Sequence, residues 1–583
     1  MSNSQFLQKA NEYIAAEQHP QFKQEIVDLV AKSNVDELHD RFYTSLEFGT
    51  GGMRGVIGGG YNRMNPLVIA RTTQGLANYI KKASASADPS AVIAYDSRRF
   101  SELFALEAAL VLCANGIRTY LYTSLRSTPQ LSFSVRHLGA TAGIVVTASH
   151  NPPQYNGYKV YWNDGAQIVA PHDTAIVSEV LSMLDSGVKR MTRDEAIAKK
   201  LLVMIDKDVD DAFIAMVKRQ AIRPELLRQH GKSVKVVFTP LHGTGAMPVS
   251  RALSEMGLDV IFVPEQREPD GNFPTVKFPN PEEASAMQMA IDLAKKNDAD
   301  LVMGTDPDAD RMGIAVKNGT DYTLVTGNQL GVLLADYIFS GKKELGTLPK
   351  KPAFVKTIVT TDLQRRVAES FGAIWFDVLT GFKFIGEKIR EFDLNPDGPQ
   401  YVFGGEESYG YLVETDVRDK DAVTAATLTA EMALYHRVRG SSLLGRLNEI
   451  YKQFGYFEET QISKNFAGSE GVEAIKNLMN KLRSNPPSSF GDQKVVLVKD
   501  YQDGTTTTIA TQSKAKNINL PSSNVIQLLL ESGDLVTARP SGTEPKIKFY
   551  ASCCSEAGQE LVVAKKFVAG KIAVIKESVN SLL

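Results

Sequence analysis

The stretch LVMGTDPDADR, residues 301–311, joins a short apolar run to a loop that carries three aspartates. A run of this kind suits a strand that is buried on both faces of a largely parallel sheet. The polar loop follows the strand directly, and open α/β sheets gather their ligands at the carboxyl ends of strands. This one segment therefore predicts both an α/β layer and a place for chemistry.

The same pattern recurs along the chain, where an apolar run ends in a polar loop with Gly or Pro. The other examples are AVIAYDSRR (91–99), GIVVTASHNPP (143–153), VKVVFTPLHGTG (234–245) and YVFGGEESYG (401–410). Amphipathic helix candidates, such as 248–256 and 283–296, lie between several of them. Strand–loop–helix alternation over 583 residues predicts several similar α/β domains, because so long a chain exceeds a single core.

The composition is that of an ordinary globular protein, with 43% hydrophobic and 23% charged residues. The formal charge is −2, from 65 basic and 67 acidic side chains, so we expect no nucleic-acid and no membrane partner. The three cysteines have no disulfide or zinc spacing, and the first residues have no apolar signal region. These features predict a cytoplasmic protein with reduced thiols.

The three aspartates of the first loop, Asp306, Asp308 and Asp310, stand at alternate positions. On an extended segment their carboxylates would project to one side and repel unless a cation neutralised them. Oxygen ligands favour Mg²⁺ or Ca²⁺ over zinc. An EF-hand is excluded because its sixth position would be Arg311 and its twelfth Lys317. The loop predicts a metal site, with an acidic surface turn as the alternative.

A serine on a polar turn, Ser149, follows the run GIVV, and His150 and Lys159 are near it in sequence. Such a serine is accessible enough to act as a nucleophile or phosphoryl carrier, while the other two could move protons or offset phosphate charge. The alternative is a turn in which Ser149 and Asn151 bond their own backbone. There is no GxSxG elbow, which disfavours an α/β-hydrolase.

A third loop, RPSGTEPK at residues 539–546, combines cations, hydroxyls and a glycine. The planar guanidinium of Arg539, two hydroxyls and Gly-permitted amides could cradle a phosphate, with Lys546 on the other side of the turn. A plain hairpin turn is the alternative. Smaller ligand loops are suggested by Glu406 and Ser408 in GGEESYG and by Thr380-Gly381; taken alone, each pattern favours an ordinary turn.

Nucleotide-binding signatures are not supported. Gly231-Lys232-Ser233 ends like a P-loop, but Leu226 stands where the first glycine would be. In Gly243-Thr244-Gly245 the third small residue of a dinucleotide fingerprint is replaced by Pro248. A phosphate cradle beside a metal loop, without a nucleotide site, indicates an enzyme that carries its own phosphoryl group.

Taken together, TASHNP, DPDADR, GEESYG and RPSGTEPK resemble, in the same order, the four functional loops of the α-D-phosphohexomutase family. The opening EFGTGGMRG and the run NGYKVYWNDGAQI are most similar to its phosphoglucomutase-2 branch. The resemblance spans nearly the whole chain. It implies an α/β fold of four domains around a central cleft, with three related mixed-sheet domains and a smaller C-terminal α+β domain. The boundaries we expect are 1–205, 206–322, 323–456 and 457–583.

The resemblance also implies roles for individual residues. Ser149 would carry the phosphoryl group, and Asp306, Asp308 and Asp310 would hold Mg²⁺ together with an oxygen of phosphorylated Ser149. Residues that would contact the sugar phosphate or lie beside the phosphoserine are Arg54, Lys159, Arg311, Thr380, Gly381, Glu406, Ser408 and Lys420. Residues that would grip the non-reacting phosphate are Arg539, Ser541, Gly542, Thr543 and Lys546. Relatives with Gly-His in the sugar loop differ from Tyr409-Gly410 here, which leaves the general base open between Lys159, His150 and a third group.

The activity implied is the interconversion of glucose 1-phosphate and glucose 6-phosphate through a sugar bisphosphate that also serves as activator. Mannose phosphates, a phosphopentomutase and a glucose-1,6-bisphosphate synthase remain open within the family. Outside it, the alternatives are a metal-dependent sugar-phosphate phosphatase and a non-catalytic sensor. The expected partners are small sugar phosphates, and the expected state is a monomer or weak homodimer.

Overall fold

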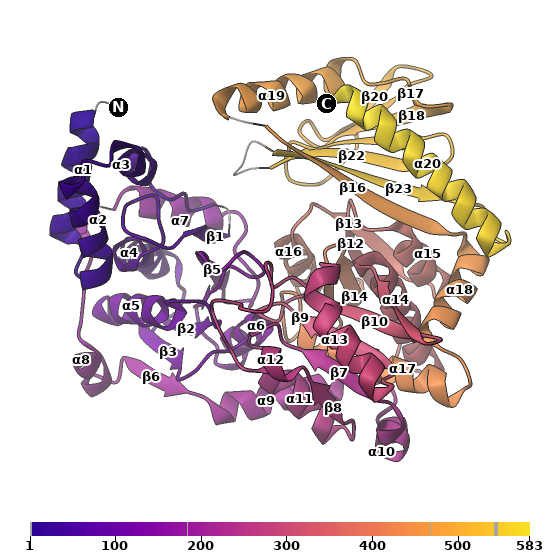
Figure 1. The fold of residues 1–583 in the computed structure, drawn as a ribbon, viewed down its shortest axis with the longest axis horizontal. Helices are drawn as coiled ribbons and strands as arrows, with labels where there is room; N and C mark the ends of the chain where they lie inside the picture. Colours follow the sequence, from indigo (N-terminus) through magenta and orange to yellow (C-terminus); the bar gives the residue numbers. More distant parts are fainter. Residues whose placement is uncertain (1–2, 50, 184, 467, 542–545) are drawn as a thin grey trace. The chain divides into compact units, whose positions relative to one another are not determined.

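The computed structural model describes residues 3–49, 51–183, 185–466, 468–541 and 546–583 (Figure 1). The chain divides into two compact units. The first comprises Met1–Gly327 and Phe382–Arg439, and the second comprises Asn328–Gly381 and Gly440–Leu583. Each unit is described by itself below.

The first unit begins with a mixed sheet of strand order β1-β5-β4-β2-β3-β6. Strands β4, β2, β3 and β6 are parallel, whereas β5 pairs antiparallel with both β4 and β1. The strands are β1 Gly52–Val56, β2 Ser90–Tyr95, β3 Arg118–Tyr122, β4 Ala142–Val146, β5 Tyr155–Trp162 and β6 Leu202–Ile205. The helices of this layer are α4 Pro66–Ala83, α5 Ser101–Ala114, α6 Thr128–His137, α7 His172–Leu181 and α8 Arg193–Ala198.

Three helices precede this sheet and form a small cluster of their own, drawn in indigo in Figure 1. They are α1 Asn3–Ala16, α2 Pro20–Ala31 and α3 Val35–Phe42. Buried aromatic rings join them, since Tyr13 makes edge contacts with Phe42 and with Tyr61 of the segment after β1. Each ring is removed from water, so the cluster has a core separate from that of the sheet.

A second mixed sheet follows, of order β11-β10-β9-β7-β8. Its parallel strands β8, β7 and β9 continue into the antiparallel β10 and β11. The strands are β7 Val236–Thr239, β8 Val260–Phe262, β9 Leu301–Thr305, β10 Met312–Asn318 and β11 Asp321–Val325. The helices are α9 Lys207–Arg219, α10 Pro224–His230, α11 Ala246–Glu255, α12 Pro264–Arg267 and α13 Ala284–Asn297.

The first unit is completed by residues from later in the chain. Strands β14 Gln400–Glu406 and β15 Gly410–Leu412 form an antiparallel hairpin whose tip is the segment 407–409. Helices α16 Phe382–Asp393 and α17 Ala422–Val438 flank it. Helix α17 packs on α9, α10 and α11, and nearly its whole surface is therefore buried.

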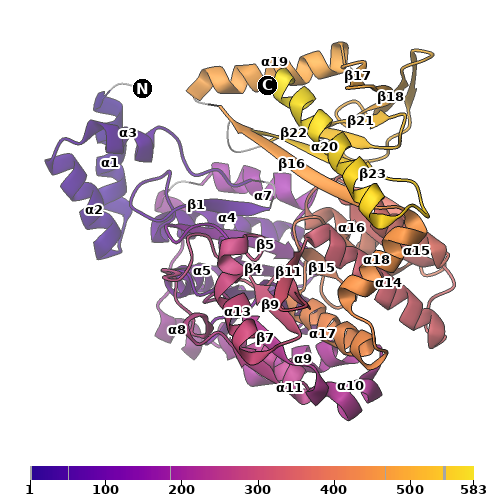
Figure 2. The same cartoon turned by 45° about the vertical axis from the view of Figure 1, so that its right-hand side comes forward.

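The second unit contains the parallel pair β12 Pro352–Thr357 and β13 Ile374–Val378, with helices α14 Gly327–Glu344, α15 Asp362–Ser370 and α18 Leu443–Phe454. A largely antiparallel sheet of order β16-β23-β22-β21-β18-β19-β20 follows, with β17 beside β18. Helices α19 Gly468–Ser484 and α20 Leu561–Leu582 lie on one side of it (Figure 2). The strands are β16 Phe457–Asn465, β17 Ser489–Phe490, β18 Gln493–Asp500, β19 Thr505–Thr508, β20 Ser513–Lys516, β21 Ile526–Leu530, β22 Leu535–Pro540 and β23 Lys546–Cys554.

The predicted fold class is confirmed in its mixed α/β layers and in its sheet-rich C-terminal part. All five apolar runs named above are strands, namely β2, β4, β7, β9 and β14, and the two helix candidates are α11 and α13. The boundaries at 205, 322 and 456 and the central cleft stay predictions. Among the helices of the described ranges, none combines the length and apolar character needed to cross a membrane.

Candidate functional site

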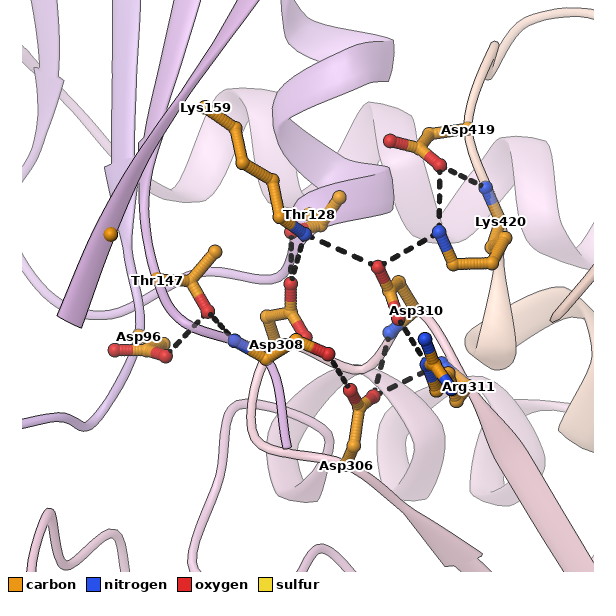
Figure 3. A network of polar contacts seen from close by, with 12 residues as sticks. Asp96, Thr128, Thr147, Lys159, Asp306, Asp308, Asp310, Arg311, Asp419 and Lys420 are labelled. Atoms are coloured by element: carbon orange, nitrogen blue, oxygen red, sulfur yellow. Dashed lines mark hydrogen bonds and ion pairs between the residues drawn. The ribbon is translucent and has the colours of Figure 1, made fainter. Parts of the chain in front are cut away.

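The predicted metal loop, the acidic segment 306–311, follows β9 and turns back into β10, so its side chains lie at the end of a buried strand. Asp306 fixes the turn, because its Oδ1 accepts the amide N–H of Asp310 at 3.2 Å and of Arg311 at 3.0 Å. Ala309 adopts φ +52°, which reverses the chain. One oxygen from each of Asp306, Asp308 and Asp310 lies within 4.8 Å of the others (Figure 3).

Charge at this loop is unevenly compensated. Burial and the neighbouring Asp308 and Asp310 raise the pKa of Asp306 well above its ordinary value. Burial acts in the same direction on Asp308, but the ammonium of Lys159 outweighs it and holds the pKa of Asp308 below the usual range. The loop thus contains one carboxylate that resists ionisation beside two that are ionised.

Two carboxylate oxygens of the loop accept no hydrogen bond from the described residues, namely Asp308 Oδ1 and Asp310 Oδ1. Both side chains are almost fully buried. A buried, charged oxygen without a donor is unfavourable by several kcal/mol unless a cation faces it. Three hard oxygen donors within 4.8 Å of one another therefore fit a divalent cation such as Mg²⁺.

Ser149 lies directly against this loop, although 157 residues separate it from Asp306. Its Oγ donates to Asp306 Oδ2 at 2.6 Å and lies 3.1 Å from His150 Nδ1. The side chain is 3% exposed, and its backbone adopts φ +51°. The left-handed conformation is uncommon for a non-glycine residue, and strain of this kind is found at functional sites.

His150 and Arg54 accompany Ser149. Burial, with the nearby Arg311 and Arg54, lowers the pKa of His150 well below its ordinary value, so the ring is neutral at neutral pH. The exposed Arg54 donates from Nη1 to Asn151 Oδ1 at 3.0 Å. The structure thus places a neutral imidazole on the serine loop and a cation, from β1, beside that loop.

Two lysines bridge the aspartates. Lys159 Nζ, from β5, lies 2.8 Å from Asp308 Oδ2 and 3.3 Å from Asp310 Oδ2. Lys420 Nζ lies 3.1 Å from the same Asp310 oxygen and 3.2 Å from Asp419 Oδ1 (Figure 3). Burial alone would favour loss of their protons, but Asp308 and Asp310 raise the pKa of Lys159, and Asp310 and Asp419 raise that of Lys420. Both are therefore cations at neutral pH.

The hairpin tip and Arg311 complete the polar surroundings in the first unit. Arg311 Nη1 donates to Glu282 Oε1 at 2.5 Å. Burial, and to a lesser degree Glu407, raises the pKa of Glu406 to about 7. Ser408 Oγ donates to Glu407 Oε1 at 3.1 Å, and Tyr409 follows in the left-handed conformation, φ +63°.

The remaining predicted site residues belong to the second unit. Arg539 is the second-last residue of β22 and Lys546 is the first of β23, and the amide of Ser541 donates to the carbonyl of Lys546 at 2.7 Å, so the two strands form a hairpin. Gly542 and Thr543 lie outside the described residues. Thr380 and Gly381 follow β13, with Gly381 at φ +124°. That these residues meet Ser149 around one substrate stays a prediction.

Some neighbours of the site were missed from the sequence. Thr128 begins α6 and donates from Oγ1 to Asp308 Oδ2 at 2.8 Å, and from its amide to the Asp308 carbonyl at 2.9 Å. Asp419 accepts from Tyr161 Oη at 2.6 Å and supports Lys420. No sequence signal assigns a role to Thr128 or Tyr161, since each reaches the site only through folding. Asp419 is the residue before Lys420, which the family resemblance had already singled out.

A buried serine hydroxyl beside a trio of acids and two cations, on strand-end loops of α/β sheets, is the make-up of a metal-dependent phosphoryl-transfer enzyme. Comparison with known proteins agrees. Residues 45–184, 211–319 and 326–454 match the phosphoglucomutase/phosphomannomutase alpha/beta/alpha domains I, II and III, respectively. The chain is 38% identical to a phosphoglucomutase of Staphylococcus haemolyticus over 521 residues, 88% of this chain and 91% of the relative.

A phosphoglucomutase of Staphylococcus aureus is also 38% identical, over 522 residues that cover 88% of this chain and 91% of the relative. Among solved structures, the fold is similar to that of phosphoglucomutase pp63/parafusin from Paramecium, with a TM-score of 0.67 at 18% identity over 92% of this chain and 95% of that one. A phosphoglucomutase/phosphomannomutase family protein from Burkholderia thailandensis gives a TM-score of 0.64 at 18% identity over 92% and 98%. The chain belongs to the phosphoglucomutase/phosphomannomutase family, an isomerase family, which confirms the predicted family and enzyme class.

Proposed function

We propose that this enzyme interconverts glucose 1-phosphate and glucose 6-phosphate, with Ser149 as the phosphoryl carrier. The observation that carries the proposal is the contact between Ser149 Oγ and Asp306 Oδ2, at 2.6 Å, inside a buried trio of carboxylates. The substrate is proposed from the relatives, which are named phosphoglucomutases and match almost nine-tenths of the chain.

Asp306, Asp308 and Asp310 would hold Mg²⁺, because their buried oxygens include two without a hydrogen-bond donor. When bound, the ion would neutralise these carboxylates and polarise a phosphoryl group next to Ser149. Lys159 contacts two of the same carboxylates, so it would add positive charge where a transferring phosphoryl group is most negative.

The transfer itself moves one phosphoryl group between two oxygens. In the forward half, the bond between phosphorus and Ser149 Oγ breaks while a bond from phosphorus to a sugar hydroxyl oxygen forms; that hydroxyl loses its proton and Ser149 Oγ gains one. In the return half, the bond between the other phosphorus and its sugar oxygen breaks while a bond from phosphorus to Ser149 Oγ forms; Ser149 Oγ loses its proton and the sugar oxygen gains one. His150 is neutral and 3.1 Å from this oxygen, so it can exchange that proton.

The residues that we propose to position the sugar phosphate belong to both the first and the second unit. Glu406, Ser408, Arg311, Arg54 and Lys420 would contact the sugar or its reacting phosphate. Thr380 and Gly381 would contact the sugar as well. Residues of the C-terminal hairpin would grip the phosphate that does not react, namely Arg539, Ser541, Gly542, Thr543 and Lys546. The proposed location is the cytoplasm, in keeping with three buried free thiols that a reducing compartment maintains.

Replacement of Ser149 by alanine tests the carrier role. We expect kcat to fall by about 10⁵-fold or more, the size seen when a covalent nucleophile is lost. The variant should also no longer be phosphorylated by glucose 1,6-bisphosphate. Mass spectrometry of the peptide that contains residue 149 measures this phosphorylation. Residual turnover above about 1% of wild type would contradict the carrier assignment.

A substrate panel separates the family activities. Coupled assays with glucose 1-phosphate, mannose 1-phosphate and ribose 1-phosphate, each with Mg²⁺, should give the highest kcat/KM for the glucose compound. A parallel assay for inorganic phosphate should remain at background, because a mutase returns the phosphoryl group to the sugar. Stoichiometric release of phosphate would identify a phosphatase, and a preference for ribose 1-phosphate would identify a phosphopentomutase.

A further inference from the structure

Arg98, in the loop after β2, has a fully buried side chain whose hydrogen bonds converge on the serine loop. Its guanidinium donates to the carbonyl oxygens of Ser149 and Asn151, both at 2.5 Å, and of Pro152 and Tyr155, both at 3.0 Å. Three of these acceptors lie in the short connection between β4 and β5, and Tyr155 is the first residue of β5. One planar cation thus gathers the carbonyl groups of the loop that carries the nucleophile.

A second chain of contacts reaches Ser149 from the same place. Asp96 Oδ1 accepts the Arg98 amide at 2.9 Å, and Asp96 Oδ2 accepts Thr147 Oγ1 at 2.6 Å (Figure 3). Thr147 Oγ1 in turn accepts the amide N–H of Ser149 at 2.8 Å. The Asp96 and Arg98 side chains are also paired, with Nε and Oδ2 3.4 Å apart. Both backbone polar groups of Ser149 are therefore tied to this pair, one through each partner.

These bonds maintain a conformation that the serine would not adopt by itself. A left-handed φ is unfavourable for a non-glycine residue by about 1–2 kcal/mol, so a free loop would relax. With its N–H bonded to Thr147 and its C=O bonded to Arg98, Ser149 keeps φ +51° and directs Oγ to Asp306. Rotation of this residue would move Oγ away from the carboxylates.

The second α/β layer covers the guanidinium. The ring of Phe273, from the segment between α12 and α13, lies 4.9 Å from the Arg98 Cζ atom. Gly271, two residues earlier, forms a backbone bridge with Arg98, and a Cβ at Gly271 would lie 2.5 Å from the Arg99 nitrogen. The close approach of the two backbones requires glycine at position 271. It also excludes water from Arg98, which strengthens the hydrogen bonds from the guanidinium to the carbonyl groups.

We propose that Arg98 is a positioning residue for phosphoryl transfer: without touching the substrate, it fixes the orientation of Ser149 Oγ towards the acidic loop. The inference rests on the proposed function of Ser149. A purely structural role for Arg98 would instead stabilise the first α/β layer and leave the reaction rate of each folded molecule unchanged. The two roles differ in what they do to kcat.

The test compares Arg98→Lys and Arg98→Met with the wild type. Lysine retains the charge but offers its donors from one point, so it cannot reach four carbonyls arranged around a planar fork. We expect kcat per folded molecule to fall by about 100-fold, as displacement of a reacting group by about 1 Å does, with KM within about twofold. The rate of Ser149 phosphorylation by glucose 1,6-bisphosphate should fall by the same factor, while its final extent is retained.

Arg446→Met is the matched control. Arg446 forms a two-fold ion pair with Asp336, at 2.7 and 2.8 Å, so its removal also takes an arginine away from a buried carboxylate, but in the second unit and without touching the serine loop. Its kcat per folded molecule should equal that of the wild type, with the folded fraction measured by circular dichroism. In an Arg98→Ala variant, millimolar guanidinium should partly restore the phosphorylation rate, whereas equal concentrations of ammonium should not.

The outcomes are separable. If the wild type is not phosphorylated at Ser149, the proposed function fails and this inference fails with it. If the wild type is phosphorylated but Arg98→Lys has a kcat within about threefold of it, only the positioning role is refuted. The role is likewise rejected if activity of the Arg98 variants falls only in proportion to their folded fraction, or if none of them folds.

Discussion

Two buried charge clusters, one in each unit, are built from the same residue types yet differ in balance. Around Lys356, in the second unit, the ammonium lies 3.0 Å from Asp362 Oδ1 and 2.9 Å from Asp377 Oδ1, and it donates to two threonine carbonyls. Arg365 neutralises the other oxygen of Asp362, at 3.0 Å. Two cations thus match two anions. At the metal loop, three carboxylates lie within 4.8 Å of one another; Lys159 pairs with two of them, whereas Lys420 is shared with Asp419 and Arg311 is shared with Glu282.

The difference distinguishes a structural cluster from a functional one. Buried ions that satisfy one another need no further partner, and loss of either member is strongly destabilising. Buried ions of one sign are retained against their own repulsion only where a ligand completes them. The acidic loop is therefore the cluster at which we propose that a divalent cation binds.

The largest effect on stability is expected at the balanced cluster. Lys356→Met leaves the half-buried carboxylates of Asp362 and Asp377 without their shared cation, so the free energy of unfolding should fall by about 3 kcal/mol, the lower end of the range for a broken buried pair. Urea denaturation measures it. Adding Asp377→Asn to the same chain should recover part of the loss, because one uncompensated charge is removed. A loss below about 1 kcal/mol would show that Lys356 is not the centre of this cluster.

At the unbalanced cluster, stability and activity should move in opposite directions. Asp306→Asn should lower kcat by about 10²- to 10³-fold, corresponding to about 3–4 kcal/mol of transition-state stabilisation. In metal-free buffer the same variant should unfold at a higher temperature than the wild type, because the folded wild type must either protonate Asp306 or keep it charged beside Asp308 and Asp310, and asparagine removes that cost. A lower unfolding temperature in EDTA would contradict the repulsion argument.

Mg²⁺ should stabilise the wild type and the Lys356→Met variant equally. At a hundred times its dissociation constant, a ligand specific for the folded state contributes about 2.7 kcal/mol. The gain should be absent from Asp306→Asn and from Asp308→Asn. Thermal unfolding at constant ionic strength, with NaCl replacing MgCl₂ in the reference, separates site binding from general screening. Equal gains in all four proteins would place the ion elsewhere.

The smallest expected effect is a dependence on pH. Because burial beside two carboxylates raises the folded-state pKa of Asp306 above its ordinary value of 3.8, the folded protein binds more protons than the unfolded one between those two values. Its stability therefore falls as pH rises through that window. The advantage of Asp306→Asn over the wild type in EDTA should grow from pH 4 upward and then level off. A difference that does not change with pH would contradict the raised pKa.

Much of the site could be located from local sequence. The alternate aspartates of the metal loop and the serine turn could both be predicted, because the polar residues of a strand-end loop lie within a few positions of one another in sequence. The apolar runs before them are strands β9 and β4. The strands on either side of the predicted phosphate loop are β22 and β23, and the role of that loop stays a prediction. Periodicity and turn chemistry act over short distances, so a single sequence records them.

The sequence by itself determined the α/β layers, the acidic loop and the candidate nucleophile. Only the tertiary structure decided that Ser149 Oγ touches Asp306, that Thr128 and Lys159 share Asp308, and that Arg98 holds the serine loop from beneath a ring of another layer. Such contacts join segments up to 180 residues apart, and they depend on packing that no local pattern encodes. Residue types and spacing specify what a loop can do, whereas the packing of the sheets specifies which loops do it together.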